Sequence, residues 1–212
     1  MFTYPKFDVE ISQQARVSDL GWPEPGDAAD DSGLGCNRAY MDLRRLSWTD
    51  AKKALADEAR LIARIENAEN PEDELSAIEE EYDESEIELY GLDIGVASTV
   101  VALSAARCVP FASCNGGVFG GRHHEVYPLV AFYARPATAN LLLAIATEAD
   151  IGLENNGYGS LVVFSDDIRK FPAFADAMIR RRKELNALRL SAPRTPKPAE
   201  KRGDSGQYEL PL

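Results

Sequence analysis

The feature that most constrains the fold of this 212-residue chain is an internal repeat of a helix, a strand, a loop and a second strand. The matching segments are residues 100–103 with 142–145, 109–111 with 151–153, and 129–132 with 161–164. The offset between the copies falls from 42 residues before the loop to 32 after it, so the first loop is longer by ten residues. A hairpin needs only a few connecting residues. Even a chance similarity of two such units would leave the extra length of the first loop to be explained.

The repeat predicts an α+β fold, because each half supplies one helix and two strands that are adjacent in sequence. Apolar runs place the strands at residues 108–114, 126–134, 151–153 and 160–164. Helix signals place helices from Asp93 to about Arg107, from Pro136 onward, and after a cap formed by Ser165, Asp166 and Asp167. We therefore predict a core domain over residues 91–190, an antiparallel sheet of about four strands with helices on one face.

The segment before this core, residues 1–90, is expected to be irregular at first and then to form an acidic helical hairpin. Prolines and glycines interrupt residues 1–40 and exclude a long helix there. Ser47 is a candidate N-cap for a helix over residues 48–68, with Asp50 as the acid of a capping box. Pro71 begins a second helix. The tail, residues 191–212, is rich in proline and is expected to be disordered.

The chain is acidic, with 35 Asp and Glu against 23 Lys and Arg and a formal net charge of −12. This balance argues against a nucleic-acid partner, because phosphate binding needs a cationic surface. Residues 57–88 contain 14 acidic side chains and two arginines. These two acidic helices are either a docking surface for a basic protein partner or a hairpin whose charges are simply solvated.

The sequence predicts a cytoplasmic protein that has no contact with a membrane. No apolar run approaches the roughly 18 residues that a membrane-spanning helix requires. The N-terminus lacks the basic and apolar regions of a secretory signal. Three cysteines do not form a disulfide framework, which favours a reducing compartment.

The candidate site lies in the long first loop, residues 115–125, and at the strand end before it. Cys114 ends a predicted strand, and His124 and Glu125 precede the next one. Because the two ends of a hairpin loop are neighbours, these side chains are expected to be close together. We interpret Cys114 as a catalytic nucleophile, His124 as its base and Glu125 as the group that orients the imidazole.

The residues around this trio are candidate ligand-binding groups. Glycines in such a turn expose backbone N–H groups, which can surround an anion. The shorter loop of the second repeat adds two amide side chains to what we expect to be a ring of loops. The ligand-binding residues expected on this basis are Ser113, Asn115, Gly116, Gly117, His123, Asn155 and Asn156.

The same residues allow simpler interpretations. A cysteine at a strand end is commonly a small buried hydrophobe, and we interpret Cys36 and Cys108 in this way. A histidine pair in a glycine-rich loop is commonly ordinary surface polarity. Thiol and imidazole also bind metals, but their spacing here matches no standard zinc pattern, so no metal site is predicted. No sequence motif identifies a cofactor.

Residues 113–116 read Ser-Cys-Asn-Gly, His124 follows, and residues 128–132 read Pro-Leu-Val-Ala-Phe. With these residues the chain resembles a group of uncharacterised bacterial and phage proteins that share a Ser-Cys-x-Gly turn, a His and a Pro-x-Val-x-Phe strand. More distantly, residues 112–117 are similar to the Ser-Ser-Cys-Ser-Gly-Arg turn of the wybutosine-synthesising tRNA methyltransferase family. The second resemblance implies binding of tRNA and S-adenosylmethionine. The similarity as a whole covers about residues 92–134, with support at the level of the fold to about residue 185.

Three hypotheses of function follow. The first is an enzyme or binding protein that uses the glycine-rich loop for a small or nucleotide-like ligand. The second is a non-catalytic accessory module that binds a protein or a small signal, in a bacterial or phage conflict system. The third is a nucleic-acid-modifying protein, which needs a basic face beside the loop. It ranks last because Arg107, Arg122 and Arg135 alone offer that charge.

Overall fold

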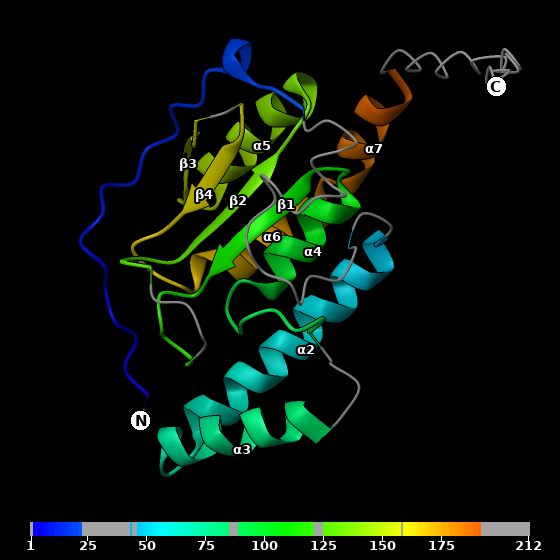
Figure 1. Ribbon diagram of the computed structural model, residues 1–212. Coiled ribbons are helices and arrows are strands. Elements are labelled where there is room, and N and C mark those ends of the chain that lie inside the picture. The colour runs from blue at the N-terminus through cyan, green and yellow to red at the C-terminus, as the bar shows by residue number, and fades with distance from the viewer. Residues whose placement is uncertain are drawn as a thin grey trace, which may run out of the picture.

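The computed structural model describes residues 2–22, 43, 46–84, 89–120, 125–157 and 159–191 (Figure 1). Its elements in chain order are a short 3-10 helix η1 (Val17–Asp19), α2 (Trp48–Asn67), α3 (Pro71–Glu84), α4 (Ala97–Ala105), β1 (Val109–Cys114), β2 (Leu129–Tyr133), α5 (Pro136–Glu148), β3 (Gly152–Asn155), β4 (Leu161–Phe164), α6 (Lys170–Arg180) and α7 (Arg182–Ser191). The four strands form one antiparallel sheet, which confirms the predicted α+β fold. The predicted disordered tail, beyond residue 191, lies outside the described residues, and so does Cys36.

The internal repeat is visible as two copies of a helix followed by a hairpin, α4-β1-β2 and α5-β3-β4. The strand order is β1-β2-β4-β3, so the second strand of each copy lies at the centre of the sheet. β2 and β4 run antiparallel. An antiparallel central pair relates the two copies by an approximate two-fold axis through the sheet, which places their hairpin loops at opposite ends.

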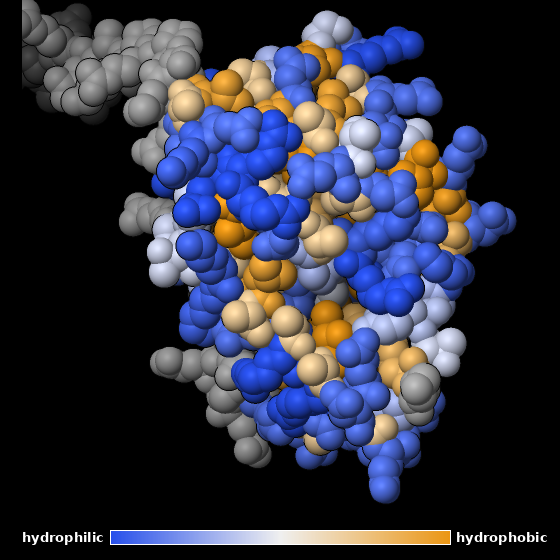
Figure 2. Space-filling view, turned by 180° about the vertical axis from the view of Figure 1, so that it is seen from behind, coloured by the Kyte–Doolittle hydropathy of each residue, from blue (hydrophilic) through white to orange (hydrophobic). Residues whose placement is uncertain are grey.

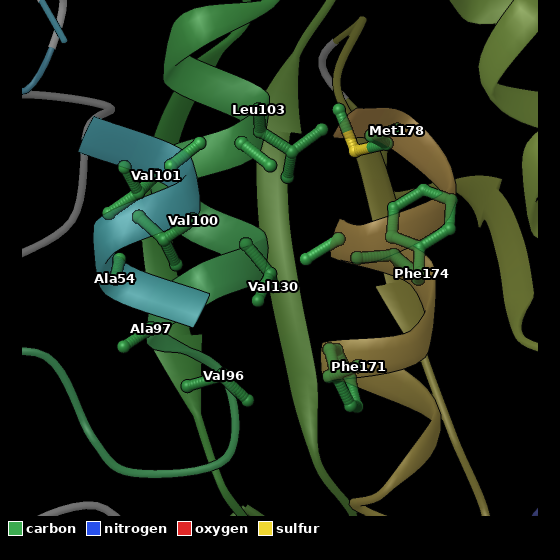
Figure 3. Close-up of a cluster of buried hydrophobic side chains, with 14 of the residues drawn as sticks. Ala54, Val96, Ala97, Val100, Val101, Leu103, Val130, Phe171, Phe174 and Met178 are labelled. Carbon is green, nitrogen blue, oxygen red and sulfur yellow. The ribbon is translucent and has the colours of Figure 1, made fainter. Parts of the chain in front are cut away.

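One face of the sheet packs against α4, α5 and α6. Its side chains are fully buried, and they are Val130, Phe132, Leu153, Leu161 and Val163. Figure 3 shows Val130 between the side chains of α4 and α6. All nine residues of α4 are buried, because this helix lies between β1 and α2. A helix enclosed on every side has no exposed polar stripe, and the hydroxyls of Ser98, Thr99 and Ser104 form hydrogen bonds inside the protein.

The acidic hairpin packs on this core through α2, which contacts both α4 and α6. The predicted capping box begins α2: the Ser47 hydroxyl accepts the N–H groups of Thr49 and Asp50, and the Asp50 carboxylate accepts the Ser47 N–H. Helix α3 packs on α2. The Arg64 guanidinium of α2 holds α3 by ion pairs of 2.7 Å to Glu74 and 2.8 Å to Glu81.

No described helix is long and apolar enough to cross a membrane. Viewed from behind, the surface is mainly hydrophilic with small apolar spots (Figure 2).

A buried carboxylate joins the hairpin to the core. Glu58 of α2 is fully buried, and its carboxylate accepts the backbone N–H groups of Gly95 and Ala97 at 2.9 Å and of Ser98 at 3.4 Å. The Ser98 hydroxyl donates a further hydrogen bond to it. The N–H groups of Ala97 and Ser98 belong to the first turn of α4, where a helix has no internal acceptors, and Gly95 lies in the turn just before it. Glu58 therefore caps a helix that is 37 residues away in sequence.

Three element boundaries differ from the sequence prediction. Helix α4 begins at Ala97 and not at Asp93, because Glu58 supplies the cap and Gly95 turns the chain with φ of +97°. Strand β2 begins at Leu129, after Pro128, which has no N–H to donate to a ladder; Val126 is 80% exposed. Helix α6 begins at Lys170, because the preceding turn already uses the Asp167 carboxylate as acceptor for the Arg169 N–H.

The N-terminal segment covers the outer edge of the sheet. The Leu153 N–H of β3 donates to the Ser12 carbonyl at 2.8 Å, and the Gln14 N–H donates to the Leu153 carbonyl at 3.1 Å. The aromatic side chains of Phe2, Tyr4 and Phe7 lie at the end of the sheet where β1 ends and β2 begins. An irregular segment thus supplies one wall of the candidate site.

We expect Gly152→Ala to destabilise the sheet, because a Cβ at this position would lie 2.5 Å from the Phe164 ring on β4. Overpacking of this kind costs about 1–3 kcal/mol of unfolding free energy. In a Phe164→Leu background the same change should cost clearly less, since the ring is absent. Urea unfolding of the four variants tests this coupling. An equal cost in both backgrounds would contradict it.

We also expect Glu58 to make stability depend on pH. Burial raises the pKa of its carboxyl from 4.5 to about 7, against the opposing effect of its hydrogen bonds. The folded protein therefore holds this proton more tightly than the unfolded chain, and the stabilisation is lost as pH rises from about 4.5 to about 7. The loss amounts to about 3 kcal/mol. Urea unfolding should show the stability difference between wild type and Glu58→Gln shrinking over this range; a pH-independent difference would refute the assignment.

Candidate functional site

The long loop of the first repeat begins after Cys114 at one end of the sheet. The structure describes its residues up to Gly120 and again from Glu125. His123 and His124, the predicted ligand and base, lie outside the described residues, so the expected closeness of Cys114 and His124 stays a prediction. The described part of the loop contacts the N-terminal segment and the acidic hairpin.

Cys114 lies at the base of this loop with its side chain 1% exposed. Its Sγ accepts the backbone N–H of Gly116 at 3.3 Å and that of Glu125 at 3.4 Å. The two donors come from opposite ends of the loop, so the loop closes around the sulfur. Burial raises the pKa of the other described cysteine, Cys108, far above its ordinary value.

Asn115 is a structural residue of the loop. Its side chain is 1% exposed, and its Nδ2 donates to the Ile94 carbonyl at 3.1 Å while its Oδ1 accepts the Gly117 N–H at 2.8 Å. Both ends of the amide are thus used inside the protein. Gly116 has φ of +68°, and a Cβ there would lie 2.9 Å from the Phe7 ring. This glycine therefore serves a left-handed turn and a close aromatic contact.

The additional loop residues fold onto the protein itself. Phe119 is 3% exposed and Val118 is 8% exposed. The Phe119 ring stacks on Phe2 at 5.4 Å and meets Tyr4 edge-on at 6.0 Å. It also lies 3.2 Å from the position of a Cβ on Gly95, at the turn that begins α4. In the described part of the loop, Phe119 therefore packs on two aromatic residues of the N-terminal segment, Phe2 and Tyr4.

Two exposed cations stand at the same end of the sheet, after β4. Lys6 and Arg169, with side chains 58% and 56% exposed, form ion pairs of 2.9 Å and 2.6 Å with Asp167. Against partial burial, the hydrogen bonds from Arg169 and Lys6 hold the pKa of Asp167 well below its ordinary value. The Arg169 guanidinium also lies over the Tyr4 ring at 4.6 Å. The ion pairs fix the N-terminal segment beside the loop.

The structure corrects the expected ring of loops. Asn155 pairs with Leu161, whereas Cys114 pairs with Leu129 and Leu129 with Phe164, so Asn155 and Asn156 lie at the opposite end of the sheet from Cys114. The Asn155 side chain hydrogen-bonds the backbone of the N-terminal segment. The cause is the two-fold arrangement of the repeats, which separates equivalent loops.

Two other expectations also change. Ser113 pairs with Val130, whose side chain faces the helices, so Ser113 and Cys114 point to opposite faces of the sheet. Arg107 precedes β1 and Arg135 follows β2, which places both at the far end of the sheet from the loop. Arg135 stacks there on Trp22 at 4.7 Å. Neither arginine therefore contributes to a basic face beside the loop.

The remaining predicted residues keep their places at the loop. Gly117 is exposed with φ of +76°, and the side chain of Glu125 is exposed. Among the described residues, no group of three or more His, Cys, Asp or Glu side chains is arranged to hold a metal ion. The sequence patterns do not indicate Phe7 and Glu58 as supports of the loop. The need to bury the aromatic residues of an irregular segment was the available signal for Phe7.

We expect Phe119→Ala to show that the loop is part of the core. Loss of a buried phenylalanine lowers the free energy of unfolding by about 3–5 kcal/mol. Val126→Ala, at a position 80% exposed, is the matched control and should change stability by about 0.5 kcal/mol or less. Urea unfolding measures both. A small effect of Phe119→Ala would mean that the loop contributes little to the fold.

Comparisons of this chain with models of protein families, with curated proteins and with solved structures gave no match. The chemical groups that the structure brings together at this site are the thiol of Cys114 and the two N–H groups that point at it, those of Gly116 and Glu125.

Proposed function

We propose that this protein binds a small or nucleotide-like ligand at the glycine-rich loop and uses the Cys114 thiol there. The observation that carries the proposal is the convergence of the Gly116 and Glu125 N–H groups on Sγ. A buried cysteine that acts only as a small hydrophobe needs no such donors. The sulfur is held by both ends of one loop, so movement of that loop alone would expose it.

The surroundings favour an anionic ligand. Lys6 and Arg169 are exposed at this end of the sheet, where each pairs with Asp167, and a phosphate or carboxylate would share these two cations with that carboxylate. The exposed Gly117 leaves room for close approach to the backbone. A nucleotide also carries a base that can stack on aromatic side chains, and the N-terminal segment supplies the partly buried ring of Tyr4 at this end of the sheet.

In the enzymatic form of this proposal, Cys114 is the nucleophile, His124 the base and Glu125 the group that orients it. The thiol proton passes to the imidazole, and a sulfur lone pair forms a bond to an electrophilic carbon of the ligand. The electron pair of the bond that breaks goes to the leaving group, which takes the proton from the imidazole. Cys114 and His124 would then both touch the reacting atoms.

Alkylation by iodoacetamide at neutral pH, mapped by mass spectrometry, tests the site. We expect Cys114 to react about tenfold or more faster than Cys108, because local opening of one loop exposes it. ATP should slow the reaction at Cys114, and adenosine should slow it less if the phosphates bind. Equal, slow reaction of both thiols, unaffected by ATP, would refute the proposal. Cys114→Ser, which conserves side-chain volume, controls for folding and should lose any shift in melting temperature caused by ATP.

A second proposal is a non-catalytic module that binds a basic protein through α3. The observation that favours it is the charge of this helix. Its sequence carries no basic residue, and the acidic side chains along it repel one another. A cationic partner would offset that repulsion.

Variants separate the two proposals. Reversal of charge at the exposed residues Glu72 and Glu80 should abolish binding of a lysine-rich peptide and leave the alkylation of Cys114 unchanged. Cys114→Ser should leave binding of the lysine-rich peptide unchanged and remove the alkylation at this position. If the peptide binds equally well to the charge-reversed protein, the second proposal is wrong.

A further inference from the structure

Three sets of contacts link the acidic hairpin to the Cys114 loop, two through an intervening segment and one directly. The Glu58 carboxylate of α2 accepts the Gly95 N–H, and the carbonyl of the neighbouring Ile94 accepts a hydrogen bond from the Asn115 side chain. The Tyr4 hydroxyl donates to the Glu66 carboxylate of α2 at 2.8 Å, and Tyr4 packs on Phe119 of the loop. On α3, the Glu79 carboxylate lies 2.8 Å from the position of a Cβ on Gly120, so a side chain there would strike it.

The first of these contacts is a continuous chain of hydrogen bonds. The Glu58 carboxylate accepts the Gly95 N–H at 2.9 Å, and the adjacent Ile94 carbonyl accepts Asn115 Nδ2–H at 3.1 Å. Asn115 in turn accepts the Gly117 N–H at 2.8 Å. Asn115 directly follows Cys114, so its position sets where the Gly116 N–H points. Each link is buried or partly buried, where water does not replace a lost partner easily.

We propose that Glu58 is a positioning residue that couples the α2–α3 hairpin to the loop around Cys114, so that displacement of the hairpin loosens the loop and exposes the thiol. The inference rests on the proposed function for its purpose, because it describes regulation of that site. Its structural content is separate: Glu58 controls the loop through Asn115. A ligand or protein that binds the hairpin would then change access to Cys114.

Amide hydrogen exchange tests the coupling without any ligand. The two amides that face the sulfur, those of Gly116 and Glu125, are compared with the Val130 amide of the central strand. Glu58→Ala should speed exchange at the two loop amides by about tenfold relative to Val130, the change produced by a coupling of about 1.4 kcal/mol. Leu61→Ala, a truncation at another buried position of the same helix, is the matched control. It should not change this ratio.

The route through Asn115 is tested by a double-mutant cycle. Asn115→Ala should speed exchange of the Gly116 amide as Glu58→Ala does, and the two changes together should add little to either alone. Independent, multiplying effects would overturn the route, and an equal effect of Leu61→Ala would show that Glu58 has a general structural role only.

If Glu58→Ala does not fold, Ser98→Ala provides the milder variant, because it removes one donor to the carboxylate. It should loosen the loop in the same direction, and no change in the ratio would refute the coupling. In the folded variants of Glu58, Asn115 and Ser98, iodoacetamide should react faster with Cys114 than it does in wild type, while its reaction with Cys108 should not change. Faster alkylation without any effect of ATP in wild type would retain the coupling and reject the ligand proposal. An effect of ATP in wild type without faster alkylation in these variants would reject the coupling and retain the ligand proposal.

Discussion

A carboxylate that is shielded from water must find its hydrogen-bond donors within the protein, and in this chain Glu58 finds them in the turn that begins α4. The same contact solves two problems, because the first N–H groups of a fully buried helix also need acceptors. Helix α4 can therefore lie between the sheet and α2 without an exposed cap. Through this contact the acidic hairpin becomes a layer of the structure, while its other charges remain at the surface.

The second constraint is the repeat. Each copy contributes its second strand to the centre of the sheet, and an antiparallel central pair sends the two hairpin loops in opposite directions. The loops can therefore differ without interfering with each other. The short second loop contacts the N-terminal segment at Gly21, whose N–H donates to the Gly159 carbonyl, and Phe119 of the long first loop packs on Phe2 near the start of that segment. One segment without regular structure thus links both ends of a symmetrical core.

Local signals in the sequence were sufficient for most elements but not for the site. Ser47 and Asp50 form their capping box as predicted, because both partners lie within one helical turn. Asp93 does not cap α4, since its competitor Glu58 is distant in sequence and no local pattern reveals it. The prediction that Asn155 and Asn156 belong to the Cys114 site requires both hairpin loops to lie at the same end of the sheet. Strand order decides that question, and it depends on tertiary packing that periodicity does not encode.

The length of the first loop was the sequence feature that pointed to function, and the structure gives it a structural purpose as well. Phe119 fills space beside Gly95 and under Phe2, so part of the extra chain is required for packing. A loop needed for packing alone, however, has no reason to direct N–H groups from both of its ends to a thiol. Packing holds the described part of the loop in a defined shape, and under the proposed function that shape keeps the sulfur closed until the loop moves. On the same proposal, the aromatic contacts of Phe119 set how much free energy opening requires, and the hairpin is placed to change that amount. Glu79 lies beside the loop, whereas Glu58 and Glu66 reach it through the turn before α4 and through Tyr4.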